Sequence, residues 1–148
     1  EVDEIFTDKY KFVPGHACEV IKEKKDFIIS SGPMIHNCID AIKILKKRYN
    51  LSVGLINIHS LKPFNQNSLI KIIKDNSNIL VVEDHTFYGG LFSIVNNNLC
   101  NIKKKINLDF LAINDDFVDS GKPMELEKKF GFNPLNIAKK FSAIKNTK

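Results

Sequence analysis

Two kinds of apolar pattern alternate along this chain, and the alternation limits the folds it can adopt. Short apolar runs typical of buried strands lie at residues 26–30, 51–58, 78–84 and 106–113. Helices are predicted at residues 34–45, 65–75, 89–99, 123–130 and 134–141, where apolar residues recur at spacings of three and four or a proline opens the segment. Strands that alternate with helices need right-handed crossovers, which leave neighbouring strands parallel. The pattern predicts a three-layer α/β/α fold with a mostly parallel sheet.

The beginning of the chain departs from this alternation. Residues 17–21 and 26–30 are apolar segments on either side of the polar sequence KEKK, so we predict a β-hairpin there. The hairpin would add one antiparallel edge strand to the parallel sheet. Residues 1–15 show no clear periodicity and end at Pro14-Gly15. We interpret residues 1–15 as a lead-in or linker and residues 16–148 as one domain.

The charge pattern argues against nucleic acid as a partner. The net charge is +5, but Arg48 is the only arginine among 22 basic residues. Arginine dominates the recognition of phosphates and bases because its planar guanidinium binds two acceptors at once. The lysines are spread along the chain, with a single triplet at residues 103–105. We predict no nucleic-acid partner.

The sequence also carries no signal for membranes or secretion. No apolar run approaches the ~18 residues needed to cross a bilayer, and the opening EVDEIFTDKYKF is unlike a signal peptide. Cys18, Cys38 and Cys100 lie far apart and form no CxxC pair. Their odd number and mostly apolar neighbours are typical of reduced, packed thiols. We expect a cytoplasmic protein with no membrane partner.

Polar residues gather where the predicted strands end, which is where open parallel sheets bind ligands. These positions hold Ser30, Ser31, Gly32, His59, Ser60, Glu83, Asp84, His85, Asp115 and Asp116. Acids and histidines on one edge are potential metal ligands. Loops at strand ends are polar by default, however, because a buried loop would leave backbone groups without hydrogen bonds. We predict a solvated or interfacial edge and no metal site.

The segment VVEDHTFYGGL, residues 81–91, places two glycines at a predicted helix start. Free N–H groups at such a start bind anions, but neither GxGxxG nor GxxxxGK[ST] is present. Alternatively, Gly89 and Gly90 let the helix approach the sheet or another subunit closely, and we favour that interpretation. The sequence shows no nucleophile or acid partner placed to act in catalysis with His85, so we predict no catalytic residue. The candidates for an interface or anion site are Glu83, Asp84, His85, Gly89, Gly90, Ser31, Gly32 and His59.

Four segments, in this order, resemble the motifs of one enzyme family. They are DFIISSGPMIHNCIDAIKIL at 26–45, LSVGLINIHSLKPF at 51–64, VVEDHTFYGGLFSIV at 81–95 and DDFVDSGKPMELEKKFGFNPLNIAKKF at 115–141. They resemble the C-terminal domain of transketolase, including the C-terminal subunits of split forms, and the related domains of deoxyxylulose-phosphate synthases and 2-oxo acid dehydrogenase β subunits. The resemblance runs from about Gly15 to about Phe141. Phe92 stands where the family has glycine, Asn65 where it has aspartate and Phe132 where it has leucine.

The resemblance implies a five-stranded, mostly parallel sheet in an enzyme that uses thiamine diphosphate and Mg²⁺ to transfer two-carbon ketol units between sugar phosphates. In this family the GDG…N segment that holds the metal and diphosphate, and the glutamate that acts on the aminopyrimidine, lie on other domains. The chain contains no GDG. The resemblance therefore implies a structural, dimer-building domain that has no catalytic, cofactor-binding or metal residues and is inactive alone.

The partners expected from the resemblance are the diphosphate- and pyrimidine-binding domains or subunits of the same enzyme, and a further copy of the chain in a homo-oligomer. Two alternatives stay open. The chain is similar enough to the same domain of a deoxyxylulose-phosphate synthase or a 2-oxo acid dehydrogenase β subunit for either to be its parent enzyme. It is also compatible with a stand-alone assembly or ligand-binding module that has kept the fold without catalysis.

Overall fold

The computed structural model describes residues 4–8, 10–115, 121 and 123–146, with the side chains of residues 123 and 124 left aside. Its strands are β1 (Cys18–Ile21), β2 (Phe27–Ser30), β3 (Gly54–Asn57), β4 (Ser77–Thr86) and β5 (Ile106–Ile113). Its helices are α1 (Met34–Tyr49), α2 (Gln66–Ile72), α3 (Leu91–Leu99), α4 (Pro123–Phe130) and α5 (Pro134–Asn146). The predicted alternation of strands and helices is confirmed, although several elements begin or end at other residues than expected.

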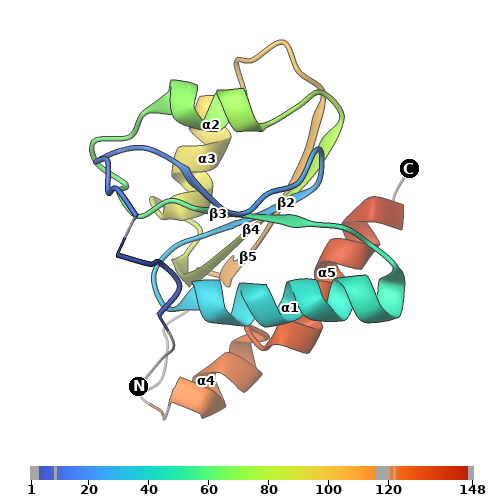
Figure 1. The fold of residues 1–148 in the computed structure, drawn as a ribbon. Helices are drawn as coiled ribbons and strands as arrows, with labels where there is room; N and C mark the ends of the chain where they lie inside the picture. The colour runs from blue at the N-terminus through green and yellow to red at the C-terminus, as the bar shows by residue number, and fades with distance from the viewer. Residues whose placement is uncertain (1–3, 9, 116–120, 122, 147–148) are drawn as a thin grey trace.

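The five strands form one sheet in the order β1-β3-β2-β4-β5 (Figure 1). Strand β1 is antiparallel to β3, whereas β3, β2, β4 and β5 are parallel to their neighbours. The predicted fold, a mostly parallel five-stranded sheet between helices with one antiparallel edge strand, is confirmed.

The predicted hairpin is wrong, because β3 lies between β1 and β2. Every residue of β2 is buried, whereas every residue of β1 is half-buried. A strand that is apolar on both faces gains most in the centre of a parallel sheet, and a half-buried strand suits an edge. The polar segment that follows β1 therefore leads past β3 to the centre of the sheet instead of forming a tight turn.

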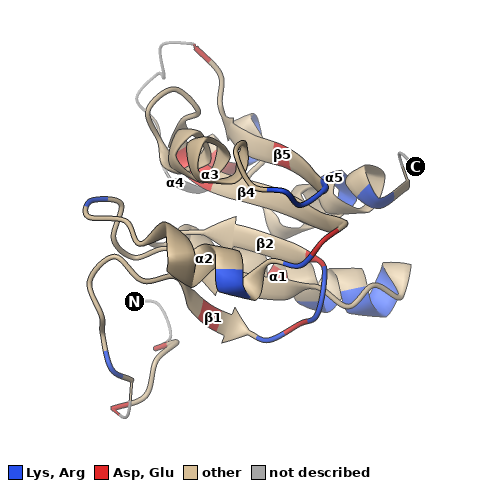
Figure 2. Ribbon diagram, turned by 90° about the horizontal axis from the view of Figure 1, so that it is seen from above, with Lys and Arg blue, Asp and Glu red and all other residues tan. Residues whose placement is uncertain are grey.

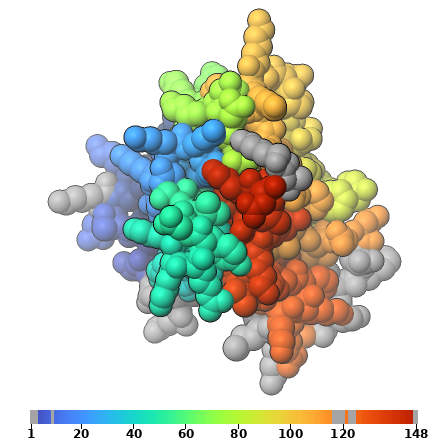
Figure 3. All heavy atoms as spheres, turned by 90° about the vertical axis from the view of Figure 1, so that its right-hand side faces the viewer, coloured from blue at the N-terminus to red at the C-terminus, as the bar shows by residue number. Residues whose placement is uncertain are grey.

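Helices cover both faces of the sheet. Helices α1 and α5 pack on one face, where Ile28, Leu45, Leu80 and Phe141 belong to one apolar cluster. Helices α2 and α3 pack on the other face, around a second cluster. Figure 3 shows α1 and α5 side by side on the surface, in agreement with their close packing. The layers therefore follow the alternation of side chains along the buried strands.

The order of the strands creates one crevice. From the carboxyl end of β2 the chain crosses to β3 on one side, and from the carboxyl end of β4 it crosses to β5 on the other side. These two crossovers diverge between β2 and β4, and in α/β sheets ligands bind at such a switch point. Helix α1 begins just after β2, and α3 begins just after β4. The residues at 30–34 and 83–91 therefore surround this crevice.

Basic residues gather at the opposite, amino end of the parallel strands. Lys46, Lys47 and Arg48 lie in the last turn of α1, which leads to β3, and the triplet at residues 103–105 immediately precedes β5. Figure 2 shows these segments in blue on one side of the molecule. Cations at helix C-termini are stabilised by the helix dipole, which accounts for much of this distribution.

Candidate functional site

The carboxylate of Glu83 caps helix α3. Glu83 lies near the end of β4 and is 3% exposed. Its Oε2 accepts a hydrogen bond from the Leu91 amide at 2.6 Å, and its Oε1 accepts one from the Phe92 amide at 2.9 Å. The first amides of a helix have no partner within the helix, and its positive dipole end favours a negative charge. The end of β4 and the start of α3 are thus held together by one buried carboxylate.

Gly90 and Gly89 serve this arrangement in different ways. A Cβ atom on Gly90 would lie 2.1 Å from Glu83 Oε2 and 2.6 Å from the Thr86 carbonyl oxygen, so the absence of a side chain makes room for the carboxylate. Gly89 instead has a φ of +71°, in the left-handed region that glycine adopts most readily, with nothing near its Cβ position. Gly90 is needed for close approach, and Gly89 for the turn.

The electrostatics of Glu83 bear on whether an anion can bind at the start of α3. Burial raises the pKa of Glu83 above its ordinary value, and the hydrogen bonds from the Phe92 and Leu91 amides oppose that rise. An external anion at this helix start would have to approach the Glu83 carboxylate, which already accepts from the two amides. The geometry therefore favours the packing interpretation of the two glycines. The role of the candidate residues in an interface or anion site remains a prediction.

Aromatic rings support the turn between β4 and α3. The Ser93 hydroxyl donates to the Phe87 carbonyl oxygen at 2.6 Å and accepts from the Gly89 amide at 2.9 Å. The rings of Phe87 and Phe92 both contact that of Phe110 on β5, with centroid distances of 5.0 and 4.4 Å. Phe92 replaces the family's glycine, yet its amide still donates to Glu83. The larger side chain is accommodated because its ring points toward β5.

His85 is exposed, and its Nδ1 lies 3.0 Å from the Thr86 carbonyl oxygen. A backbone carbonyl can fix the orientation of an imidazole ring, but it supplies neither a nucleophile nor an acid for catalysis. His85 is therefore an exposed residue at the end of β4 with no catalytic partner among these contacts.

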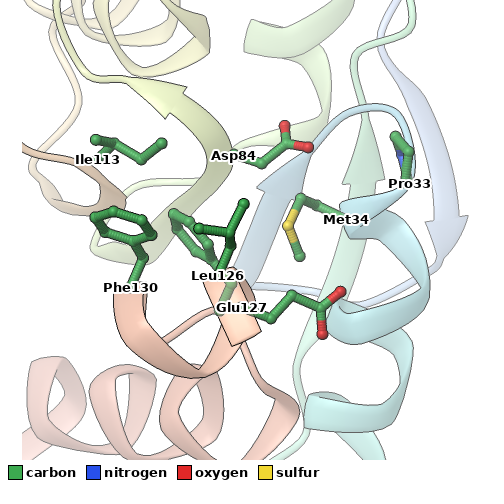
Figure 4. A pocket seen from close by; sticks show the side chains of 8 residues that line it. Pro33, Met34, Asp84, Ile113, Leu126, Glu127 and Phe130 are labelled. Atoms are coloured by element: carbon green, nitrogen blue, oxygen red, sulfur yellow. The ribbon is translucent and has the colours of Figure 1, made fainter. Parts of the chain in front are cut away.

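Asp84 faces a pocket of about 390 Å³ at the switch point (Figure 4). The apolar lining comes from Pro33 and Met34 at the start of α1, from Ile113 at the end of β5, and from Leu126, Phe130 and Phe132 in and after α4. Two carboxylates, those of Asp84 and Glu127, complete it. The candidates Ser31 and Gly32 directly precede the pocket residue Pro33, so this part of the predicted edge lies beside the pocket.

His59 belongs to a separate part of the structure. Its Nδ1 lies 3.3 Å from the Tyr10 hydroxyl, its Nε2 lies 3.1 Å from the Val13 carbonyl oxygen, and the Phe12 ring lies 4.5 Å away between centroids. The lead-in segment thus packs over the end of β3. Burial, followed by a hydrogen bond to Cys18, raises the pKa of Tyr10 to about 12, so this phenol stays protonated at neutral pH. The eight candidates therefore fall into three groups around Glu83, Asp84 and His59.

The edge of the sheet shows no metal centre in the part of the chain that the structure describes, where no group of three His, Cys, Asp or Glu side chains is placed to hold an ion. Asp115 is exposed, and Asp116 lies outside the described residues. Among the helices that are described, none is long and apolar enough to cross a membrane.

Sequence reasoning missed a polar network at the amino end of the sheet. Asp26 is 6% exposed; its Oδ1 accepts from Asn78 Nδ2 at 2.8 Å, and its Oδ2 accepts from the Lys145 ammonium group. Asn107 extends the network by donating to Asn78 and to the Ile144 carbonyl oxygen. Burial alone would raise the pKa of Asp26, but the hydrogen bonds from Lys145 and Asn78 outweigh it and lower that pKa. Asparagines in predicted strands were the available signal, because a buried amide needs partners.

The comparison with protein families gives the decisive result. Residues 15–137 match the family model "Transketolase, C-terminal domain". The chain belongs to this family. The resemblance predicted from about Gly15 to about Phe141 is confirmed over nearly its whole length.

Curated relatives of this transketolase C-terminal domain include two kinds of enzyme. The 1-deoxy-D-xylulose-5-phosphate synthase of Clostridium tetani is 33% identical over 122 residues, which are 82% of this chain and 20% of that protein. One of the subunits of the apulose-4-phosphate transketolase of Actinobacillus succinogenes is 28% identical over 139 residues, which are 93% of this chain and 44% of that protein. The chain thus spans about a fifth to less than half of the length of these relatives.

Solved structures show the same fold. A split-gene transketolase, described as an "inactive beta4 tetramer", superposes with a TM-score of 0.82 and 23% identity over 97% of this chain and 46% of that one. The transketolase of Leishmania mexicana gives a TM-score of 0.67 with 17% identity over 88% of this chain and 18% of that one.

Proposed function

We propose that this chain is the C-terminal, dimer-building domain of a thiamine-diphosphate-dependent transketolase-like enzyme that transfers two-carbon ketol units between sugar phosphates. The family match over residues 15–137 carries the proposal. The chain spans less than half of the apulose-4-phosphate transketolase subunit that it matches, which supports a need for further domains. In this proposal the chain supplies architecture and contacts, and it is inactive without the domains that hold the cofactor.

The described residues do not fit the cofactor. A thiamine diphosphate site needs oxygen ligands for the metal that carries the diphosphate. Among the described residues no group of three His, Cys, Asp or Glu side chains is placed to hold such a metal, and the start of α3 donates its Leu91 and Phe92 amides to Glu83. We therefore derive no catalytic step on this chain, and we assign the binding of the diphosphate, the metal and the pyrimidine to partner domains.

The same proposal extends to assembly and location. The split-gene transketolase with a TM-score of 0.82 is described as an "inactive beta4 tetramer". This description supports both homo-oligomerisation and the lack of activity of such a chain alone. Cys18, Cys38 and Cys100 are free thiols, which supports a reducing compartment such as the cytoplasm.

A second parent enzyme is favoured by one observation. A 1-deoxy-D-xylulose-5-phosphate synthase is 33% identical to the chain, whereas the apulose-4-phosphate transketolase subunit is 28% identical. The two proposals give the chain the same role and differ in the product of the complete enzyme.

Reconstitution tests the proposed function. The 148-residue chain is mixed with the diphosphate- and pyrimidine-binding domains encoded in the same genome, with thiamine diphosphate and Mg²⁺. We expect ketol transfer between sugar phosphates in the complete mixture and none with the chain alone. Formation of 1-deoxy-D-xylulose 5-phosphate instead would identify the second parent enzyme. Turnover by the chain alone would refute the structural role.

A further inference from the structure

The pocket at the switch point has the size and position of a ligand site. Its volume of about 390 Å³ lies within the range of small-molecule pockets, roughly 300–1,000 Å³. It lies beyond the carboxyl ends of β2, β4 and β5, where α/β sheets bind ligands. Helix α4 forms one of its walls, and the start of α1 forms another (Figure 4). It is separate from the buried contact between Glu83 and α3.

The lining of the pocket is apolar and partly aromatic. Met34 and Phe132 are buried beneath it, at 4% and 3% exposure, while Ile113, Leu126 and Phe130 are half-buried. An apolar group that entered the pocket would therefore displace water from the exposed parts of Ile113, Leu126 and Phe130. Burial of apolar area is the main source of affinity for such a group.

Two carboxylates give the pocket its charge. In Figure 4 the carboxylate of Asp84 lies above the Met34 side chain, and that of Glu127 lies below it. The ion pairs within the described part of the chain involve neither Asp84 nor Glu127. Positive charge near these carboxylates comes from the start of α1, with a partial charge of about half a unit, and from Lys128 and Lys129, which are exposed on α4. A carboxylate that takes part in none of these ion pairs and lies beside an apolar wall attracts a cation that carries an apolar group.

The charge of the molecule as a whole points the same way. The basic runs at residues 46–48 and 103–105 lie at the amino end of the sheet (Figure 2). The pocket lies beyond the carboxyl end of the sheet. These two basic runs are thus at the far side of the sheet from Asp84 and Glu127, where screening by salt weakens their influence.

We propose that this pocket binds a small organic cation, in which an aromatic or aliphatic group lies against Met34, Leu126 and Phe130 and a protonated amine is attracted by the carboxylates of Asp84 and Glu127. The assignment does not depend on the parent enzyme or on its catalytic domains. It also differs from the anion site that was the alternative for residues 81–91, because the charged groups here are carboxylates.

Titration of the 148-residue chain with three probes of nearly equal size tests the proposal. The probes are 2-phenylethylammonium, neutral 2-phenylethanol and anionic phenylacetate, and binding is followed by NMR at the methyl groups of Met34 and Ile113. We expect saturable shifts with the ammonium ion, affinity at least fivefold weaker for the alcohol, and no saturable shift with phenylacetate. Asp84→Asn and Glu127→Gln should each raise the Kd for the ammonium ion about fivefold, which corresponds to ~1 kcal/mol, the upper value for an exposed ion pair.

The matched control is Asp40→Asn, which removes a carboxylate from α1 outside the pocket and should leave the Kd unchanged. Amide spectra of each variant establish that it is folded. Equal affinity for the ammonium ion and the alcohol, preference for phenylacetate, or an unchanged Kd in either pocket variant would overturn the proposal. The absence of any saturable shift with all three probes would overturn it as well.

Discussion

Replacement of Gly90 by alanine tests whether the buried cap between Glu83 and α3 shapes this end of the molecule. The added Cβ would lie 2.1 Å from Glu83 Oε2 and 2.6 Å from the Thr86 carbonyl oxygen, so either the carboxylate or the helix start must move. The backbone of Gly90 has a φ of −84°, which alanine adopts without strain. Any loss of stability therefore comes from the contact with Glu83 and Thr86.

The magnitude follows from what the displacement removes. Glu83 accepts two amide hydrogen bonds, and a hydrogen bond to a charged group contributes ~1.5–3 kcal/mol. Crowding of a packed site costs ~1–3 kcal/mol when the structure adjusts. Since adjustment keeps part of the hydrogen bonding, we expect Gly90→Ala to lower the free energy of unfolding by about 3 kcal/mol. For a domain of this size the melting temperature should fall by roughly 6–12 °C.

Urea unfolding, followed by far-UV circular dichroism, measures the effect. A double-mutant cycle with Glu83→Ala isolates the contact, because alanine at position 83 removes the oxygen that the new Cβ would meet. We expect the double variant to be at least ~1 kcal/mol more stable than the sum of the single effects predicts. Additive effects, or a loss below ~0.5 kcal/mol for Gly90→Ala, would refute the reasoning.

Three further predictions concern the core, the polar network and the thiols. Phe141→Ala removes a fully buried ring from the α1–α5 side of the sheet and should lower the free energy of unfolding by ~3–5 kcal/mol in the same urea assay. Lys145 helps to hold the pKa of Asp26 below its ordinary 3.8, so the stability contributed by Asp26 should be present above that value and be lost as the pH falls through the lowered pKa. Lys145→Met should weaken this acid dependence in unfolding curves measured between about pH 2 and pH 7. Burial raises the pKa of Cys38 to about 12, so iodoacetamide at about pH 8 should alkylate the exposed Cys100 and leave Cys38 unmodified. Mass spectrometry of the peptides measures the modification, and rapid alkylation of Cys38 in the folded chain would contradict its burial.

The sequence predicts the strands and helices wherever the pattern that identifies them lies within a few neighbouring residues. The apolar run at residues 27–29 in β2 and the spacing of Met34, Cys38 and Leu45 in α1 identify a buried strand and a helix with one apolar face. Asn65 is a similar case, since its side chain accepts a hydrogen bond from the Ser68 amide and caps α2. The ordered motifs were specific enough to predict the family, which the match over residues 15–137 confirms.

The candidate site could be read only in part. The sequence placed Glu83 and Gly90 near each other, because only a short turn separates β4 from α3. It did not show that Glu83 points inward to cap α3 while Asp84 faces the pocket, since that difference depends on how the end of β4 leaves the sheet. Glu127 was not among the candidates, because α4 reaches the switch point only after the chain has completed the sheet.

By itself, then, the sequence determined the kinds of element, their order and the family, because periodicity and motif spacing are properties of neighbouring residues. The tertiary structure alone decided that β1 pairs with β3, that Asp26 meets Lys145 across the length of the chain, and that Asp84 and Glu127 share one pocket. The physical reason is that these pairings join residues that are distant in the sequence, and each residue could pair equally well with many others of the same kind. Strand order and helix packing are settled by the burial of whole apolar faces, and no local pattern records which partner will cover each face.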